Sequence, residues 1–168
     1  MAFSHELPTQ RSCFLDLIGW SEGTVTGKHP LTKLDGYDVV VTGVNGPSLF
    51  TDFSAHPFFP NKPPIVVNSK GLKSTASGRY QHMLKDWVHY RDLLKLPDFG
   101  PASQDKWCIQ LIKERGALDE IDRGEISKAI SLCSNLWASF PGAGYGQFEH
   151  KMQPLLDAYA KFGGKVTA

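Results

Sequence analysis

The chain has few cysteines, no large excess of charge and no long apolar run. Its 168 residues include three cysteines, and the formal net charge is +1. A chain with so little excess positive charge lacks the electrostatic footprint of a nucleic-acid-binding protein, so we expect no nucleic acid partner. No apolar run approaches membrane-spanning length, and no polybasic tether is present, so no stable membrane insertion is expected. The chain does not open on a basic segment followed by an apolar one, so no cleaved signal sequence is expected.

The cysteines and histidines do not form a metal-binding pattern. Cys13, Cys108 and Cys133 are odd in number and lack zinc-site spacing. Cys133 falls on the apolar stripe 126–137, and Cys108 follows Trp107. We therefore predict reduced, buried thiols, which suit synthesis in a reducing cytoplasm. The six histidines make no paired ligand motif, and neither a metal nor any other cofactor is expected.

Hydrophobic periodicity predicts a mainly helical protein with one β-leaning region, which is an α+β fold. Residues 36–43 are β-branched and bounded by glycines, and Asn45-Gly46 is a hairpin turn signal before a returning strand at 48–53. Prolines in 54–73 exclude a helix there and indicate a long ordered loop. We expect one domain over residues 1–168, with a β-rich lobe at about 24–73 and a helical lobe from the remainder.

The helices are expected where apolar residues recur at helical spacing. The expected ranges are about 9–22, about 80–94, 101–115, 126–137 and 148–162. Asp122 and Glu125 have the spacing of a capping box ahead of the fourth of these helices.

Glu22 ends the first expected helix and is the most informative residue. Phe14, Ile18 and Glu22 are four residues apart, so the apolar row of an amphipathic helix ends in a carboxylate. Apolar neighbours such as Trp20 and the negative end of the helix dipole both raise the pKa of such a group. A carboxylic acid that is protonated near neutral pH suits general acid catalysis at a glycosidic oxygen. The alternative is a glutamate in a frayed last turn that extends into solvent.

Two further segments have the composition of ligand-binding loops. Residues 74–81 (Ser74 to Gln81) are small and polar, and we expect them to approach a helix start where Gly78 admits a ligand and Arg79, Tyr80 and Gln81 offer donors and an aromatic surface. Residues 140–148 contain three alternating glycines that would expose Tyr145, whose ring face can stack on a sugar, and Gln147, whose amide can hydrogen-bond hydroxyl and N-acetyl groups. The alternatives are an ordinary capped helix start and a flexible loop.

A further group of candidate residues is the acidic set Asp35, Asp38 and Asp52 around the β-region. A glycoside hydrolase usually needs a second carboxylate beside its acid. Asp38 is the best-placed candidate, although an aspartate beside a turn is more often a backbone cap.

Several motifs along the chain occur together in one known family. They are Trp20-Ser21-Glu22-Gly23-Thr24, Gly36-Tyr37-Asp38-Val39, Leu49-Phe50-Thr51-Asp52, Leu72-Lys73-Ser74-Thr75, Gly78-Arg79-Tyr80-Gln81, 112–118, Ile121-Asp122-Arg123-Gly124, Cys133-Ser134-Asn135, Trp137-Ala138-Ser139 and 141–151. With these motifs the sequence resembles the phage lambda endolysin family of lytic transglycosylases over roughly residues 11–165. Residues 25–35 and 54–68 depart from the family in length and composition, which leaves the groove shape and the subsite preference open.

The resemblance implies a lysozyme-like fold with a small antiparallel β-sheet lobe flanking a substrate groove. It also implies cleavage of the β-1,4 bond between N-acetylmuramic acid and N-acetylglucosamine in peptidoglycan, with a 1,6-anhydromuramic acid product. The intact Ser-Glu-Gly-Thr context makes Glu22 the single catalytic acid. Among the substrate contacts, Ser74, Tyr80, Gln81, Tyr145, Gln147 and Asp38 are the residues we expect.

The same resemblance implies a monomer that acts on peptidoglycan glycan strands during host cell lysis. Synthesis in the host cytoplasm without a signal sequence would require a separate phage membrane pore protein for release to the periplasm. Two alternatives remain at this stage. One is a hydrolytic muramidase that uses Asp38 as a second carboxylate, and the other is a non-catalytic peptidoglycan-binding protein.

Overall fold

The computed structural model describes residues 9–167 and divides the chain into two compact units. The first unit consists of the chain up to Glu22 together with the chain from Cys108 onward, and the second is Gly23–Trp107. Helix α3 (Pro101–Glu114) begins in the second unit and ends in the first. Within residues 9–167, no helix is both long and apolar enough to cross a membrane.

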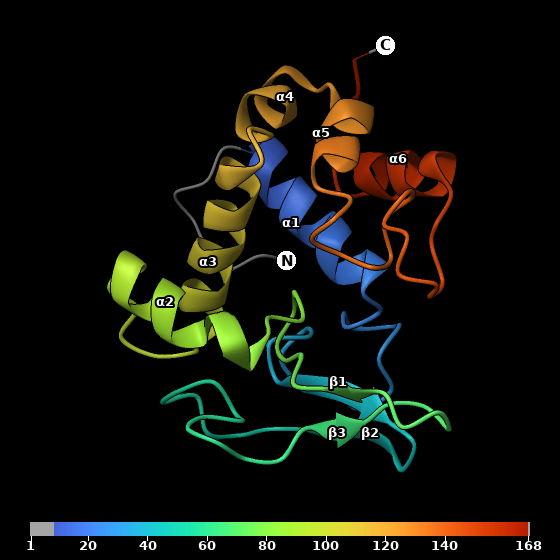
Figure 1. The fold of residues 1–168 in the computed structure, drawn as a ribbon. Coiled ribbons are helices and arrows are strands. Elements are labelled where there is room, and N and C mark those ends of the chain that lie inside the picture. The colour runs from blue at the N-terminus through green and yellow to red at the C-terminus, as the bar shows by residue number, and fades with distance from the viewer. Residues whose placement is uncertain (1–8, 168) are drawn as a thin grey trace. The chain divides into compact units, whose positions relative to one another are not determined.

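The first unit is built from helices (Figure 1). Besides the end of α3, they are α1 (Thr9–Ser21), α4 (Leu118–Arg123), α5 (Ile126–Leu132) and α6 (Met152–Lys161). Helix α1 contacts both α4 and α6, and α5 also contacts these two helices. A long segment without regular secondary structure, coloured orange in Figure 1, connects α5 to α6.

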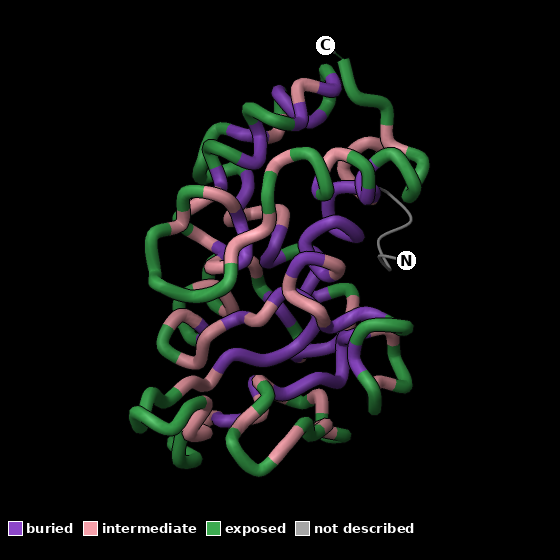
Figure 2. The backbone as a smooth tube through the Cα atoms, turned by 90° about the vertical axis from the view of Figure 1, so that its right-hand side faces the viewer, coloured by how far each residue is buried: buried purple, intermediate pink, exposed green. Residues whose placement is uncertain are grey.

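Helix α1 is the centre of the first unit's core. Residues 13–19 are all buried, the longest buried run in the described chain (Figure 2). The ring of Phe14 packs edge-on against those of Phe140 and Tyr159, at centroid distances of 6.4 and 6.5 Å. The prediction of an amphipathic helix is therefore wrong, because Asp16 is buried together with the apolar residues of α1. A helix that is buried all round lies inside a core, so its apolar residues need no single face.

Two small antiparallel hairpins form the sheet structure of the second unit. Strand β1 (Val39–Gly43) pairs with β2 (Gly46–Leu49), with Val39 opposite Leu49. Strand β3 (Ile65–Val66) pairs with β4 (Lys73–Ser74). The predicted hairpin is confirmed, but its turn is Val44-Asn45, one residue earlier than expected. The second hairpin was not predicted, because two-residue strands carry no periodicity.

The core of the second unit combines aromatic rings with a buried polar network. The ring of His82 stacks on Trp107 at 4.1 Å, and Phe99 packs against both Trp107 and Trp87. The side-chain amide of Gln104 donates to the carbonyl oxygens of Tyr37 and Phe99, and its oxygen accepts from the Arg79 backbone N–H. The side-chain oxygen of Gln104 thus fixes the turn at residues 77–82, and its amide nitrogen joins that turn to the backbone at Tyr37 and Phe99.

The helix boundaries differ from the predictions at several places. Helix α2 (Leu84–Leu94) begins about four residues later than expected, α5 ends at Leu132, and α6 begins at Met152. The expected capping box is wrong, because Glu125 makes no side-chain cap at α5 and Asp122 instead pairs with Arg11. Helix α4 was missed, since six residues are too few for a clear helical period.

The three cysteines are free and buried, as the sequence indicated. Burial raises the pKa of Cys133 to about 12, so its thiol stays protonated. These side chains act as small apolar core residues rather than as nucleophiles.

Candidate functional site

Glu22 directly follows the last turn of α1. Its backbone N–H donates to the Ile18 carbonyl oxygen at 2.9 Å, which continues the helical hydrogen bonding by one residue. Gly23, with φ of +72°, then turns the chain in a conformation that glycine adopts without strain. The backbone of Glu22 is consequently fixed by the end of a buried helix.

The Glu22 carboxyl group has one side-chain partner of known geometry. The Ser139 hydroxyl donates to its Oε1 at 2.6 Å, and the same hydroxyl lies 3.1 Å from the Ser21 hydroxyl. Burial raises the pKa of Glu22 to about 7, while hydrogen bonds from the side chain and backbone of Ser139 oppose this rise. At neutral pH the protonated and ionised forms are therefore both populated, as acid–base catalysis requires.

Ser139 is fixed by the connection between α5 and α6. The backbone N–H of His150 donates to the Ser139 carbonyl oxygen at 2.8 Å. The His150 ring packs against the Trp20 ring at a centroid distance of 4.9 Å with the two planes tilted by 33°, and one of its ring nitrogens lies 3.3 Å from the Ser21 carbonyl oxygen. The segment that carries Ser139 and His150 is thereby tied to the end of α1 at Trp20 and Ser21 and at Glu22 itself.

The glycine-rich segment 141–149 also lies in the first unit. Gly142, Gly144 and Gly146 all have positive φ values, between +66° and +81°. The Glu149 carboxylate accepts from the backbone N–H groups of Gly142 and Gly144, at 2.9 and 2.8 Å, and these bonds lower its pKa. The loop is thus organised around one carboxylate.

Tyr145 and Gln147 are exposed on this loop, as the sequence indicated. Tyr145 is 55% exposed and its hydroxyl donates to the Asn135 carbonyl oxygen at 2.8 Å, so its ring is held at the surface. Gln147 is exposed as well. Exposure leaves both side chains available to a ligand.

Tyr80 contradicts its predicted role. It is only 1% exposed, and its hydroxyl donates to Asp105 Oδ1 at 2.5 Å, beside the Tyr37 hydroxyl that donates to the same oxygen at 2.7 Å. A ring in the core of the second unit cannot offer its face to a sugar, so the expectation of a sugar contact is corrected. The sequence was misleading because a tyrosine in a polar segment can either be exposed to a ligand or be buried with its hydroxyl hydrogen-bonded.

The remaining predicted contacts of segment 74–81 lie in the second unit. Gln81 is half-buried in a left-handed conformation (φ +54°), and its side-chain amide donates to the Gly78 carbonyl oxygen at 3.0 Å. Ser74 is half-buried in β4, and its hydroxyl accepts from the Ala76 backbone N–H. The close approach at Gly78 is made by Gln104, not by a ligand, since a Cβ there would lie 2.1 Å from Gln104 Oε1.

Asp38 is a backbone cap. It is 4% exposed, and its two carboxylate oxygens accept separately from the Thr32 hydroxyl at 2.6 Å and the Lys33 backbone N–H at 2.9 Å. Both oxygens therefore hold the turn at 32–33. The structure supports the alternative that Asp38 is a backbone cap. A role for Asp38 in binding substrate or as a second catalytic carboxylate has no geometric support.

Sequence reasoning missed the structural importance of Ser139 and Arg79. Ser139 carries no signal beyond its place in a family motif, because its partner Glu22 is 117 residues away. Arg79 is 1% exposed and pairs with Asp35 at 2.6 Å, although a small polar segment suggested an accessible donor. Among the described residues, no cluster of three or more His, Cys, Asp or Glu side chains could hold a metal ion.

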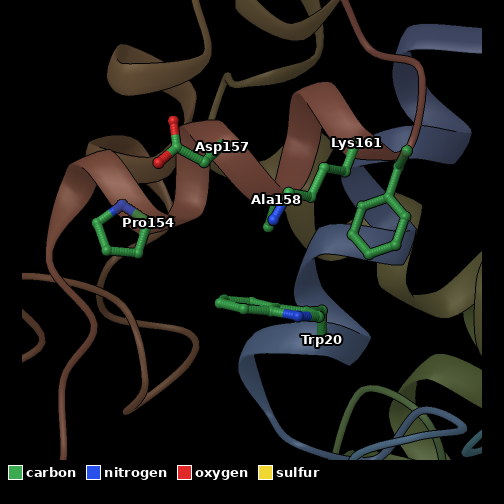
Figure 3. A pocket seen from close by; sticks show the side chains of 6 residues that line it. Trp20, Pro154, Asp157, Ala158 and Lys161 are labelled. Atoms are coloured by element: carbon green, nitrogen blue, oxygen red, sulfur yellow. The ribbon is translucent and has the colours of Figure 1, made fainter.

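An open pocket lies elsewhere in the first unit (Figure 3). Its volume is about 320 Å³, and the flat face of Trp20 borders it on the side opposite α6. The lining residues are Trp20, Pro154, Asp157, Ala158, Lys161 and Phe162. None of the site residues expected from the sequence lines this pocket.

Comparison with known proteins agrees with this architecture. The Endolysin family model matches residues 12–166. The chain is 56% identical to the endolysin of Escherichia phage P2 over 91% of its length and 92% of that protein, and 52% identical to the endolysin of Escherichia phage lambda over 96% of both chains. The solved structure of bacteriophage lambda lysozyme complexed with a chitohexasaccharide matches with a TM-score of 0.87 and 51% identity, covering 98% of this chain and all of that one.

A second structure of lysozyme from bacteriophage lambda matches with a TM-score of 0.83 and 49% identity, again over 98% of this chain and 100% of the other. The fold is accordingly that of a lysozyme-like α+β enzyme, as the sequence predicted. The chain belongs to the endolysin family. It is a peptidoglycan-degrading enzyme of the phage type.

Proposed function

We propose that the enzyme is a lytic transglycosylase in which Glu22 serves as both acid and base. The substrate is the β-1,4 bond between N-acetylmuramic acid and N-acetylglucosamine. The observation that carries the proposal is the Glu22 carboxyl group, whose pKa is raised to about 7 and which is held by Ser139. The chitohexasaccharide bound by the lambda lysozyme, a β-1,4-linked chain of N-acetyl sugars, supports a glycan substrate.

The reaction needs one proton carrier and no water. Protonated Glu22 donates to the glycosidic oxygen as the bond to muramic acid C1 breaks. The C6 hydroxyl oxygen of the same sugar then bonds to C1, and its proton passes to the ionised Glu22. The product is a 1,6-anhydro end, and Glu22 is returned to its starting form. The use of both Asp38 oxygens in a turn supports this route over a hydrolase with Asp38 as second carboxylate.

We also propose that the whole chain acts as a single catalytic domain and as a monomer. In this proposal Tyr145, Gln147, Gln81 and Ser74 contact the glycan, and the exposure of the first two supports their role most directly. Synthesis in the host cytoplasm, release through a separate phage pore protein and action in the periplasm complete the proposed course of host lysis.

Paired substitutions test the assignment. Glu22→Gln keeps the size of the side chain but cannot carry a proton, and it should lower the rate of peptidoglycan clearance by about 10²–10⁴-fold or more. Asp38→Asn should cost only about 1–2 kcal/mol through its cap, or roughly a tenfold lower rate. A folded Glu22→Gln protein with near wild-type clearance, or a dead but folded Asp38→Asn protein, would reject the proposal.

A further inference from the structure

We propose that Ser139 and Ser21 form a hydrogen-bond relay with Glu22 that reverses direction when Glu22 gains or loses its proton. The inference rests on the proposed function, because only a group that is acid and base in turn needs both of its charge states to be satisfied. The two serines are positioning residues, since they act on the reaction through Glu22.

The relay is defined by three short distances within the first unit. Glu22 Oε1 lies 2.6 Å from Ser139 Oγ, Ser139 Oγ lies 3.1 Å from Ser21 Oγ, and Ser21 Oγ lies 2.9 Å from the Ile18 carbonyl oxygen. Both serines are buried, at 9% and 7% exposure, so water does not easily replace these partners. The relay begins at the carboxyl group and ends inside the last turn of α1.

The Ile18 carbonyl fixes the direction at one end. A carbonyl oxygen only accepts, so the Ser21 hydroxyl donates to it in either state, and the lone pairs of Ser21 Oγ remain able to accept from Ser139. Ser139 has a single hydroxyl hydrogen and two possible acceptors, Glu22 and Ser21. The direction of this one hydrogen is therefore what changes.

Each charge state of Glu22 has its own complete set of hydrogen bonds. When Glu22 is ionised, the Ser139 hydroxyl donates to the carboxylate at 2.6 Å, as a short charge-assisted bond. When Glu22 is protonated, its own O–H donates to Ser139 Oγ and the Ser139 hydroxyl turns toward Ser21 Oγ. Only one hydroxyl rotates, so no heavy atom has to move between the acid step and the base step.

The neighbouring ionisable groups have other partners. One ring nitrogen of His150 lies 3.3 Å from the Ser21 main-chain carbonyl oxygen, and the Glu149 carboxylate accepts from the backbone N–H groups of Gly142 and Gly144. Asp16 lies earlier on α1 and is buried. The causes of the Glu22 pKa shift are burial and the Ser139 hydrogen bonds, with no charged group among them.

The relay predicts opposite effects for its two serines. Ser139→Ala removes the hydroxyl donor to the carboxylate and leaves the backbone donor, so the pKa of Glu22 should rise and the alkaline limb of the pH–rate profile should move up by about 1 pH unit. Ser21→Ala removes the acceptor that the protonated state needs, so Ser139 stays directed at Glu22 and the limb should move down by a similar amount. A merely structural loss would lower the rate at every pH without moving the limb.

The experiment compares variants in clearance of purified peptidoglycan from about pH 4 to 9. Ser139→Thr keeps a hydroxyl and should keep the wild-type limb. Ser131→Ala is the matched control, because its exposed hydroxyl donates to the Ser127 carbonyl oxygen within the same helix-rich unit. Glu22→Gln in the same assay tests the proposed function separately.

The outcomes distinguish a failure of the proposed function from a failure of the relay. Activity in folded Glu22→Gln would overturn the proposed function. If Glu22→Gln is inactive, the relay alone would be overturned by either of two results. The alkaline limb could stay unmoved in Ser139→Ala and Ser21→Ala, or it could shift in the same direction in both variants. If Ser139→Ala fails to fold, the downward shift in Ser21→Ala decides the question, because an unmoved or raised limb in that variant contradicts the relay.

Discussion

Two glutamates of the first unit show how the surroundings of a residue decide its chemistry. Burial raises the pKa of Glu22 to about 7, whereas two backbone N–H donors lower the pKa of Glu149. Glu149 is thereby kept ionised as the anchor of a loop, and Glu22 exchanges its proton near neutral pH. The difference comes from burial, which outweighs the Ser139 hydrogen bonds at Glu22 but is the smallest of the causes at Glu149, and burial cannot be inferred from residue type.

The raised pKa of Glu22 has a measurable effect on stability. The folded protein binds the Glu22 proton more tightly than the unfolded chain, so this contribution is complete below about pH 4.5 and is lost as the pH rises through about 7. Glu22→Gln removes that dependence. The free energy of unfolding of the variant minus that of wild type should therefore increase by about 1–3 kcal/mol from pH 4 to pH 8, as measured by urea denaturation.

Glu149→Gln is the control with the opposite sign. Its folded-state pKa is lowered, so wild type holds the extra stability above the unfolded pKa and loses it as the pH falls. The difference between this variant and wild type should therefore shrink toward acid pH. A Glu22→Gln difference that stays flat from pH 4 to 8 would show that the carboxyl group is not buried as described.

At the scale of elements, the turn at 77–82 is the most constrained part of the second unit. Gly78 has φ of +77°, and a Cβ there would meet Gln104 Oε1 at 2.1 Å. Gly78→Ala should cost about 2–4 kcal/mol of unfolding free energy, since it adds both backbone strain and a buried clash.

Gly142→Ala is a matched comparison for this substitution. Gly142 has a similar φ of +81° but nothing within 4 Å of its would-be Cβ, so only the strain of about 1–2 kcal/mol is expected. Thermal or urea unfolding of the two variants separates the two effects. Equal losses in both would mean that Gln104 yields to the new methyl group and does not fix the turn.

The elements that the sequence predicted well are those with local causes. Helices α1 and α3 were located within one residue, because continuous apolar spacing and Pro101 at a helix start are local features. The first hairpin followed from its β-branched strand and its turn residues. Burial was harder to predict, since Tyr80 lies in a polar segment but is buried against Asp105, which is 25 residues away in the sequence.

The candidate site was predictable only in part for the same reason. Glu22 could be found because its carboxylate ends an apolar helix and its motif is specific. Ser139 could not be paired with it, because no periodicity relates residues 117 positions apart. Segment 74–81 was misjudged because two left-handed residues, Gly78 and Gln81, turn the chain where helical spacing favoured a first turn.

For the whole molecule, buried histidines predict sensitivity to acid. Burial lowers the pKa of His56 to about 4 and that of His82 to about 3. The unfolded chain, with histidine pKa values near 6.5, binds these protons first, so stability should fall as the pH drops from about 6.5 to 4. The total loss should be on the order of a few kcal/mol.

This acid effect is best measured in the Glu22→Gln background, because Glu22 contributes with the opposite sign below pH 7. Urea denaturation at pH 7 and pH 4.5 gives the free energies, and amide hydrogen exchange in α2 assigns the loss to the second unit. Constant or rising stability toward pH 4.5 would contradict the burial of neutral His56 and His82.

In the proposed reaction Glu22 works without a second carboxylate and without water as a reactant. Mass spectrometry of peptidoglycan digested in ¹⁸O-labelled water distinguishes this reaction from hydrolysis. We expect every new muramic acid end to be an anhydro sugar, lighter by one water than a hydrolytic end, free of ¹⁸O and resistant to borohydride reduction. Reducible ends that carry ¹⁸O would instead identify the enzyme as a hydrolase.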